Sequence, residues 1–256
     1  MIELNIDNNL AELVLNAPQK MNALNEQALA ELSQALDRAE NAQVRALILR
    51  GEGRGFCAGR DIAGLNPSTD DAYAYLAEKV TPLLQRIARF PAPTFAAVHG
   101  PCLGVGLGLA IAADVVYVAK TAKIGSPFAN LGATLDSGGH WLFVERLGAH
   151  RALDLIYTAD LIDGEEAVRA GLFSRALLED ELLEFTRTTA ARVATGATGA
   201  FLTSKELVAQ IRDERLGLWE SIERENLAQG KLCSSEDYAE GFAAFTEKRK
   251  PQFRGR

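Results

Sequence analysis

Helical and strand patterns alternate along the first half of this chain, and no other feature limits its fold as strongly. Apolar residues either recur at helical spacing or form short continuous runs that are typical of buried strands. The helical patterns cover 25–40, 72–89 and 104–112, and the strand patterns cover 44–50, 94–98 and 115–118. Because a helix between two strands places those strands parallel in one sheet, this order predicts an α/β domain with a parallel sheet.

Both ends of the chain depart from this alternation. Two apolar-rich runs, 2–6 and 11–15, flank Asn8-Asn9, a pair that tolerates the positive φ of a hairpin turn, so two antiparallel strands are expected first. From about Ser137 onward the patterns are almost all helical, over 149–157, 164–170, 181–194, 200–211 and 216–229. We therefore expect an α/β core over 1–195 and a C-terminal helical region over 196–256.

Composition and charge exclude several classes of protein. Of the 256 residues, 48% are hydrophobic and 24% are charged, which is ordinary for a soluble globular chain. The N-terminus lacks a signal-peptide pattern and no apolar stretch reaches membrane-spanning length, so a cytoplasmic protein without a membrane partner is expected. The formal net charge of −7 disfavours nucleic acid as a partner. Cys57, Cys102 and Cys233 share no metal-ligand or redox spacing, so free thiols and no metal site are expected.

Two glycine clusters each follow a predicted strand. The first, 53–62, frees a loop to present main-chain N–H groups to an anion. The second, 98–108, leads into a helix of small residues, whose first N–H groups have no intrahelical acceptor. Either cluster also fits a plain role, as a turn or as close helix packing, so neither alone identifies a binding site.

Four segments in order resemble the signatures of the crotonase superfamily, the enoyl-CoA hydratase/isomerases: 16–24, 56–61, 99–114 and 131–139. The tail 238–249 resembles the closing motif of that family, so the likeness runs from end to end. It implies the crotonase fold, in which repeated ββα units form a parallel-sheet core and C-terminal helices form a trimerisation region. A homotrimer or homohexamer is expected, because an apolar helical third would otherwise expose much hydrophobic surface.

The same resemblance implies an acyl-CoA thioester as the substrate, with no separate cofactor, since coenzyme A enters as part of that substrate. The backbone N–H groups of Arg60 and Val105 would form an oxyanion hole for the thioester carbonyl. Residues expected to contact coenzyme A are Lys20, Ala58, Asp61, Ile62 and Lys248, the two lysines as candidate phosphate contacts.

Hydratases of this family resemble one another in two glutamates that handle water, and this sequence departs at both places. Gly108 stands at the first position and Phe128 at the second. Adding water across a double bond needs a group that deprotonates the water and a group that protonates carbon. Efficient hydration is therefore disfavoured, and glutamate restored at both positions is expected to raise it.

A different carboxylate, Asp136, stands where hydratases usually carry a small residue. Its placement resembles that of the isomerases of phenylacetate catabolism and some related enoyl-CoA isomerases, in which one carboxylate moves a proton between carbons. The alternative is that Asp136 only caps a helix starting near Ser137. An apolar wall that would strengthen it as a base is expected from Leu131, Ala133, Leu135 and Trp141, with Phe128 nearby.

The sequence thus leaves three hypotheses in order. The first is an enoyl-CoA isomerase with Asp136 as proton shuttle, acting on a double bond or on a ring attached to coenzyme A. The second is a hydratase or thioesterase, which would need a water-activating group. The third is a non-catalytic acyl-CoA-binding or RNA-binding homologue. His99 and His140 lack a nucleophile partner and are expected to be structural, and Cys57 is expected to be a buried thiol.

Overall fold

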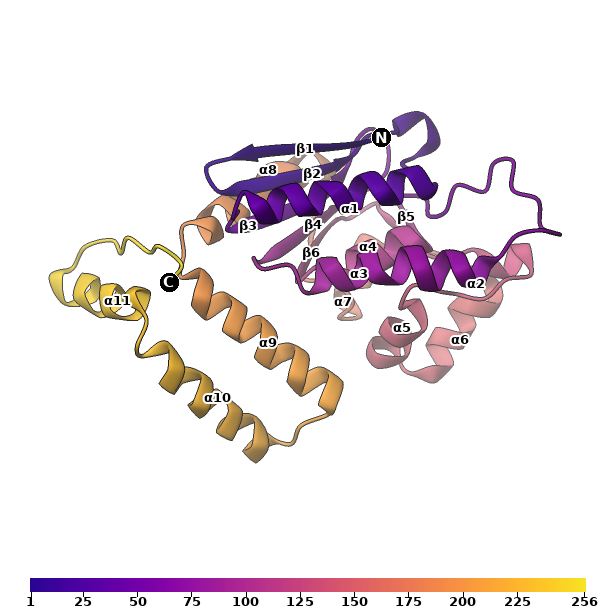
Figure 1. Cartoon of the computed structure of the whole chain (residues 1–256). Coiled ribbons are helices and arrows are strands. Elements are labelled where there is room, and N and C mark those ends of the chain that lie inside the picture. Colours follow the sequence, from indigo (N-terminus) through magenta and orange to yellow (C-terminus); the bar gives the residue numbers. More distant parts are fainter.

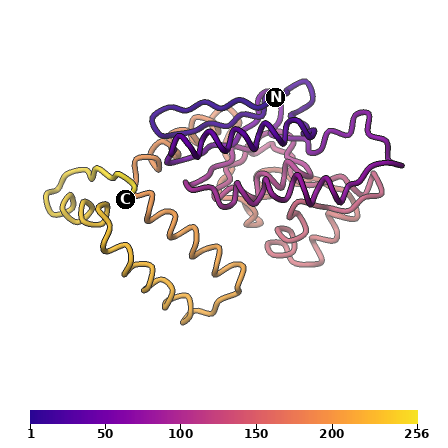
Figure 2. Tube along the Cα trace, in the orientation of Figure 1, coloured from indigo at the N-terminus to yellow at the C-terminus, as the bar shows by residue number.

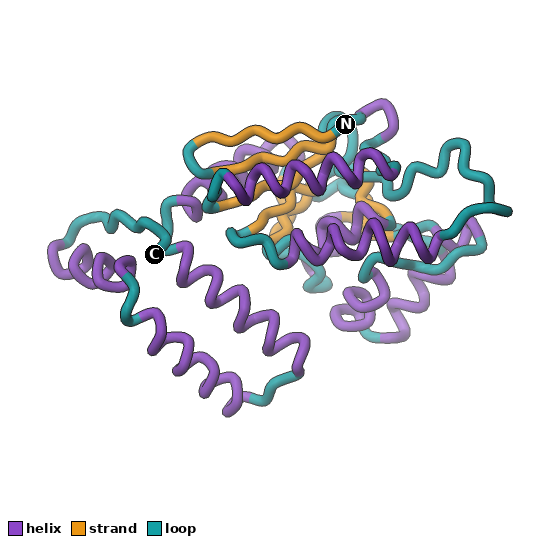
Figure 3. The backbone as a smooth tube through the Cα atoms, in the orientation of Figure 1, coloured by secondary structure: helices purple, strands orange, loops and turns teal.

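The computed structural model describes residues 1–256, and a twisted six-stranded sheet lies at its centre (Figure 3). The strands are β1 Ile2–Asp7, β2 Leu10–Leu15, β3 Ala46–Gly51, β4 Thr94–Val98, β6 Val115–Ala119 and β9 Arg175–Leu177. They lie in the order β1-β2-β3-β4-β6-β9. Only β1 and β2 pair antiparallel, and all other neighbours are parallel, which confirms the predicted α/β class with a parallel sheet.

The N-terminal hairpin also forms as predicted. Asn8 and Asn9 have φ angles of 47° and 65° between the two strands. Asparagine enters this left-handed region more easily than other residues with a side chain. The turn sets a register in which Ile2 faces Leu15.

A second, three-stranded sheet was not predicted. It consists of β5 Pro101–Leu103, β7 Lys123–Gly125 and β8 Ile162–Asp163, in the order β5-β7-β8. After Ser137, where almost all of the patterns are helical as expected, two short strands also form, β8 and β9, with two and three residues. Strands this short show no alternation of their own, so only their long-range pairing defines them.

The helices are α1 Glu26–Asn41, α2 Ala72–Ala74, α3 Thr81–Ala88, α4 Val105–Ala112, α5 Gly139–Leu147, α6 Ala149–Thr158, α7 Gly164–Arg169, α8 Glu179–Ala194, α9 Thr198–Glu214, α10 Leu218–Leu232 and α11 Glu236–Glu247. A π-helical turn, Tyr75–Val80, joins α2 to α3. Asn25 caps α1 as predicted, because its side chain accepts a hydrogen bond from the Ala28 N–H at 2.9 Å.

One hydrophobic core joins the large sheet to α1, α3, α4 and α8, and its last member is Ala194. Figures 1 and 2 show α9, α10 and α11 projecting away from this core. Their exposed apolar side chains are Phe201, Val208, Leu218, Trp219, Leu227, Phe242 and Phe245. The division into 1–195 and 196–256 stays a prediction, as does the trimer or hexamer. No helix combines the length and the apolar character needed to cross a membrane.

Candidate active site

In the loop after β3, the backbone N–H of Arg60 has no acceptor within the chain. Leu24 brackets this loop, because its N–H donates to Gly59 O at 2.8 Å and its carbonyl accepts from the Asp61 N–H at 2.9 Å. Between these two bonds, the N–H of Arg60 donates to no atom of the chain. Gly59 permits the bend with a φ of 98°. The predicted donor is therefore fixed in direction and free.

A second set of free N–H groups lies at the start of α4. Gly104 precedes the helix with a φ of 52° and offers no side-chain cap. The first intrahelical bond runs from the Gly108 N–H to Gly104 O, so the Val105 N–H precedes it. A Cβ on Gly59 would lie 2.9 Å from Leu103 O and 3.8 Å from Val105 N. The loop that carries the free Arg60 N–H therefore packs against the start of α4, where the Val105 N–H is free.

Asn22, to which the sequence analysis assigned no role, holds the first loop in place. Its side chain is 1% exposed and donates to Glu52 O at 2.9 Å and to Gly55 O at 2.8 Å. Its Oδ1 accepts from the Ala17 N–H at 2.8 Å. Asn22 has a φ of 58°, a left-handed conformation that asparagine adopts more easily than most residues. The choice of asparagine is therefore the one feature of the sequence that points to this role.

Replacing Asn22 with alanine should lower the free energy of unfolding by at least about 2 kcal/mol, because three buried backbone groups lose their partner. Urea denaturation measures this loss. Asn66→Ala is the matched control, since Asn66 is exposed and bonds only to residues two or three positions away. Equal stability of the two variants would contradict the role given to Asn22.

Asp136 lies in the segment between β7 and α5, and it does not cap the helix. Helix α5 begins at Gly139 after Gly138, and no side chain accepts a hydrogen bond from its first turn. Only the backbone carbonyl of Asp136 bonds to the Gly139 N–H, at 2.9 Å. Asp136 Oδ1 is buried without a partner, so the capping alternative is wrong.

The surroundings of this carboxyl favour its neutral form. Burial raises the pKa of Asp136 above its ordinary value, and the Ser137 side chain and the positive charges of Arg60 and His140 oppose that rise. Two hydroxyls of the same segment, Ser126 Oγ and Ser137 Oγ, are also buried without a geometrically sound hydrogen-bond partner. With Asp136 Oδ1, these are all of the buried unpaired side-chain polar atoms in the chain, and such atoms occur at catalytic sites and at sites that hold a water or an ion.

The apolar wall predicted around Asp136 is largely absent. Leu135 is 5% exposed, but Leu131 is 63% exposed and Trp141 41% exposed, and Ala133 is exposed as well. Leu131 and Ala133 precede Asp136 and Trp141 follows it within α5, and all three side chains are exposed. Burial raises the pKa of the Tyr75 phenol, and the charge of Asp136 adds to that rise.

The model of the enoyl-CoA hydratase/isomerase family matches residues 5–256. The chain belongs to this family. A probable enoyl-CoA hydratase of Rhodobacter capsulatus is 38% identical over 260 residues, covering 100% of this chain and 98% of the relative. The 1,2-epoxyphenylacetyl-CoA isomerase of Escherichia coli is 32% identical over 256 residues, covering 98% and 97%.

Solved structures of the family share the crotonase fold predicted here. An enoyl-CoA hydratase subunit of Geobacillus kaustophilus superposes with a TM-score of 0.89 at 32% identity, covering 100% of this chain and 98% of that one. An enoyl-CoA hydratase of Bacillus anthracis gives 0.89 at 28% identity, covering 100% and 99%.

Within the family site, position 108 has no room for a side chain. A Cβ on Gly108 would lie 2.5 Å from Ser137 Cβ and 2.9 Å from Ser137 O. The ring of Phe128 covers Gly104, with Cζ 2.8 Å from the position a Cβ would take there. Ser137 fills the space that a glutamate at position 108 would need, which argues against the expected gain of hydration from glutamate at both positions.

We expect Gly108→Glu to lose stability, by about 1–3 kcal/mol or more, without gaining hydration of a 2-enoyl-CoA. The double variant Gly108→Glu, Phe128→Glu should also lose stability without gaining hydration. Phe128→Glu alone should lose less stability, since Phe128 is only half-buried. Thermal unfolding and a hydration assay measure both effects. A stable Gly108→Glu enzyme with new hydratase turnover would contradict the packing described.

Four of the five residues predicted to contact coenzyme A lie on one rim of the site. Lys20 Nζ pairs with Asp61 Oδ2 at 2.7 Å, Ala58 donates its N–H to Met21 O, and Ile62 is 55% exposed. Lys248 follows α11, which lies at the opposite end of the molecule from α2 (Figure 1). A single chain therefore does not bring Lys248 to the rim.

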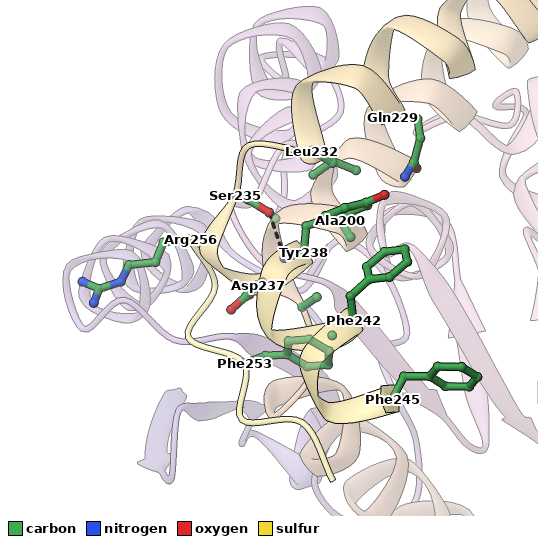
Figure 4. A pocket seen from close by; sticks show the side chains of 13 residues that line it. Ala200, Gln229, Leu232, Ser235, Asp237, Tyr238, Phe242, Phe245, Phe253 and Arg256 are labelled. Atoms are coloured by element: carbon green, nitrogen blue, oxygen red, sulfur yellow. Dashed lines mark hydrogen bonds between the residues drawn. The ribbon is translucent and has the colours of Figure 1, made fainter. Parts of the chain in front are cut away.

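Of two apolar-lined hollows in the molecule, one reaches this site. A cleft of about 870 Å³ between α3, α4 and α9 is lined in part by Gly108, Ser137 and Gly138. Figure 4 shows the other, a pocket of about 340 Å³ between α9, α10 and α11 with Phe242 and Phe253 in its wall. The second pocket shares no residue with the loops described above.

The remaining candidates have structural partners. His99 Nε2 lies 2.9 Å from Gly53 O, and His140 Nε2 lies 3.5 Å from Thr134 Oγ1. Cys57 is fully buried, its Sγ donates to Asn22 O at 3.2 Å, and burial raises its pKa to about 12. The prediction of a buried thiol at Cys57 is confirmed.

Proposed function

We propose that this member of the family isomerises an enoyl-CoA thioester, with Asp136 as the proton shuttle. The observation that supports the proposal is the half-buried Asp136 carboxyl, whose Oδ1 is buried without a partner and whose pKa the Arg60 side chain lowers. Neither Gly108 nor Phe128 carries a group that could deprotonate a water molecule for hydration.

The reaction follows from these positions. With a 3-enoyl-CoA, Asp136 takes a proton from the α carbon, and the electron pair of that C–H bond moves into the thioester carbonyl to give a dienolate. The N–H groups of Arg60 and Val105 hold the resulting oxyanion. The protonated acid then returns the proton to the γ carbon, the carbonyl re-forms, and the double bond ends in conjugation with it.

Each part is needed because a thioester α proton is weakly acidic. A carboxylate can remove it only if the enolate is stabilised, and loss of one oxyanion donor typically costs about a hundredfold or more in rate. A raised pKa also brings the carboxyl closer to the basicity that the transfer needs.

The acyl group stays open between a simple unsaturated chain and a ring. The same apparatus would serve an epoxide or unsaturated ring attached to coenzyme A, and the resemblance to the 1,2-epoxyphenylacetyl-CoA isomerase of Escherichia coli supports that variant. Lys20, Ala58, Asp61 and Ile62 would contact coenzyme A. In the proposed trimer or hexamer, Lys248 would have to reach the substrate of a neighbouring subunit.

Hydration is the second candidate, because most of the similar proteins are named as hydratases. The two reactions separate by absorbance of the conjugated enoyl thioester. With a 3-enoyl-CoA this absorbance should appear, and with a 2-enoyl-CoA it should persist. Decay of the 2-enoyl-CoA signal at a rate that exceeds the appearance from 3-enoyl-CoA would favour the hydratase.

A further inference from the structure

The Arg60 side chain makes several close contacts, although the Arg60 backbone N–H has no acceptor in the chain. Its guanidinium forms two parallel bonds to Asp70, Nη1 to Oδ2 at 2.9 Å and Nη2 to Oδ1 at 2.6 Å. The same guanidinium lies over the ring of Tyr75, with Cζ 4.0 Å from the ring centroid. Bidentate pairing together with stacking is specific to arginine, since a lysine ammonium makes neither contact in this way.

These contacts enclose the peptide of residue 60. Tyr75 is 5% exposed, and its hydroxyl donates to Leu24 O at 3.4 Å. That carbonyl also accepts the Asp61 N–H, and the Leu24 N–H donates to Gly59 O. The Arg60 side chain therefore stacks on Tyr75, and Tyr75 bonds to Leu24. The backbone of Leu24 makes the hydrogen bonds on both sides of the Arg60 N–H.

The charges around Asp136 come from several elements. Arg60 and His140 act on its carboxyl as positive charges, and Asp136 in turn acts on Tyr75. Asp70 partly neutralises Arg60, and the more distant Glu26 acts on both Arg60 and Tyr75. Asp70 belongs to the segment 62–71, which is mostly exposed, so this one ion pair ties that segment to the site.

We propose that the Arg60 side chain is a positioning residue: paired with Asp70 and stacked on Tyr75, it directs the N–H of residue 60 toward the thioester oxygen. This inference rests on the proposed function, in which that N–H is an oxyanion donor and Asp136 is the base. The guanidinium also lowers the pKa of Asp136, and Asp70 limits this effect because pairing neutralises part of the charge.

The test is the pH dependence of kcat/KM for 3-enoyl-CoA isomerisation, whose acidic limb reports the ionisation of the base in the free enzyme. Arg60→Met removes the positive charge and should move the midpoint of this limb to higher pH. Asp70→Asn leaves Arg60 unpaired and should move the midpoint to lower pH. Arg60→Lys keeps the charge but loses the bidentate pair with Asp70 and the stacking on Tyr75. It should therefore keep the parental midpoint, while the plateau rate falls about tenfold or more.

His140 also lowers the pKa of Asp136, so the three variants are repeated with His140→Gln, where the opposite shifts should persist. Asp70→Asn weakens the same pair from a mostly exposed segment and should also lower the plateau rate, so it tests the inference even if an Arg60 variant fails to fold. A plateau rate that stays parental in both Arg60→Lys and Asp70→Asn, while Asp136→Asn is inactive, would overturn this inference alone. An active Asp136→Asn enzyme that keeps the parental limb would instead overturn the proposed function.

Discussion

Asp136→Asn should lower the isomerisation rate by roughly two or more orders of magnitude, a typical loss for a general base, while acyl-CoA binding stays near the parental level. The amide keeps the shape of the side chain but cannot accept a proton from carbon. Binding is expected to persist because the oxyanion donors are backbone groups and the coenzyme A rim lies on another loop. Steady-state kinetics and calorimetric titration with a non-reactive acyl-CoA measure the two quantities.

The same substitution should stabilise the fold at neutral pH. Burial raises the folded-state pKa of Asp136, so its contribution to stability is full below the unfolded pKa and is lost as pH rises through the folded pKa. Asparagine carries no charge at any of these pH values, so the variant should unfold at a higher temperature than the parent at pH 7. A gain of 1 kcal/mol corresponds to about 2–4 °C in a chain of this size.

Asp71→Asn serves as the control, since Asp71 accepts a hydrogen bond at the start of α2 and is exposed. It should leave turnover near parental and should not raise the unfolding temperature. Near-parental turnover in Asp136→Asn would leave the chemistry unassigned, and a lower unfolding temperature at pH 7 would contradict the description of a buried, unpaired carboxylate.

Gly106→Ala should abolish most activity and destabilise the protein together. A Cβ there would lie 2.4 Å from Cys57 O and 2.7 Å from Cys57 Cβ, both in the loop that leads to Arg60. The helix that carries Val105 and the loop that carries Arg60 would be forced apart. Overpacking of this kind costs about 1–3 kcal/mol or more, and loss of oxyanion alignment about a hundredfold or more in rate.

Gly199→Ala is the matched control, because Gly199 is also helical but nothing lies within 4 Å of the added Cβ. It should be neutral or slightly stabilising, as alanine is a better helix former than glycine. Urea denaturation and isomerisation kinetics of both variants measure the difference. A Gly106→Ala enzyme that matched Gly199→Ala in stability and rate would contradict the close contact between the two loops.

The sequence predicts those parts of the fold that repeat a pattern over several residues. The strands of the parallel sheet and helices such as α1 are visible because each buries a periodic or continuous apolar run. The strands β5, β7, β8 and β9 are two or three residues long and depend on pairing with distant segments. No local pattern identifies them.

The candidate site divides in a similar way. Arg60, Val105 and Asp136 can be identified from the sequence, because the resemblance to the family assigns a role to each of their positions. Other features of the site depend on how separate segments of the chain pack together. These features are the bidentate pair of Arg60 with Asp70, the close approach of Ser137 to Gly108, and the exposure of Trp141. These contacts decide what each residue can do, and they require the three-dimensional structure.

The most direct test of enolate chemistry without hydration is mass analysis of 3-enoyl-CoA and 2-enoyl-CoA after incubation with the protein in deuterated water. We expect isomerised products that carry deuterium from exchange at the α or γ carbon, and no product to which water has been added. A dominant product that has gained the elements of deuterated water, or recovery of both thioesters with neither isomerisation nor deuterium, would contradict it.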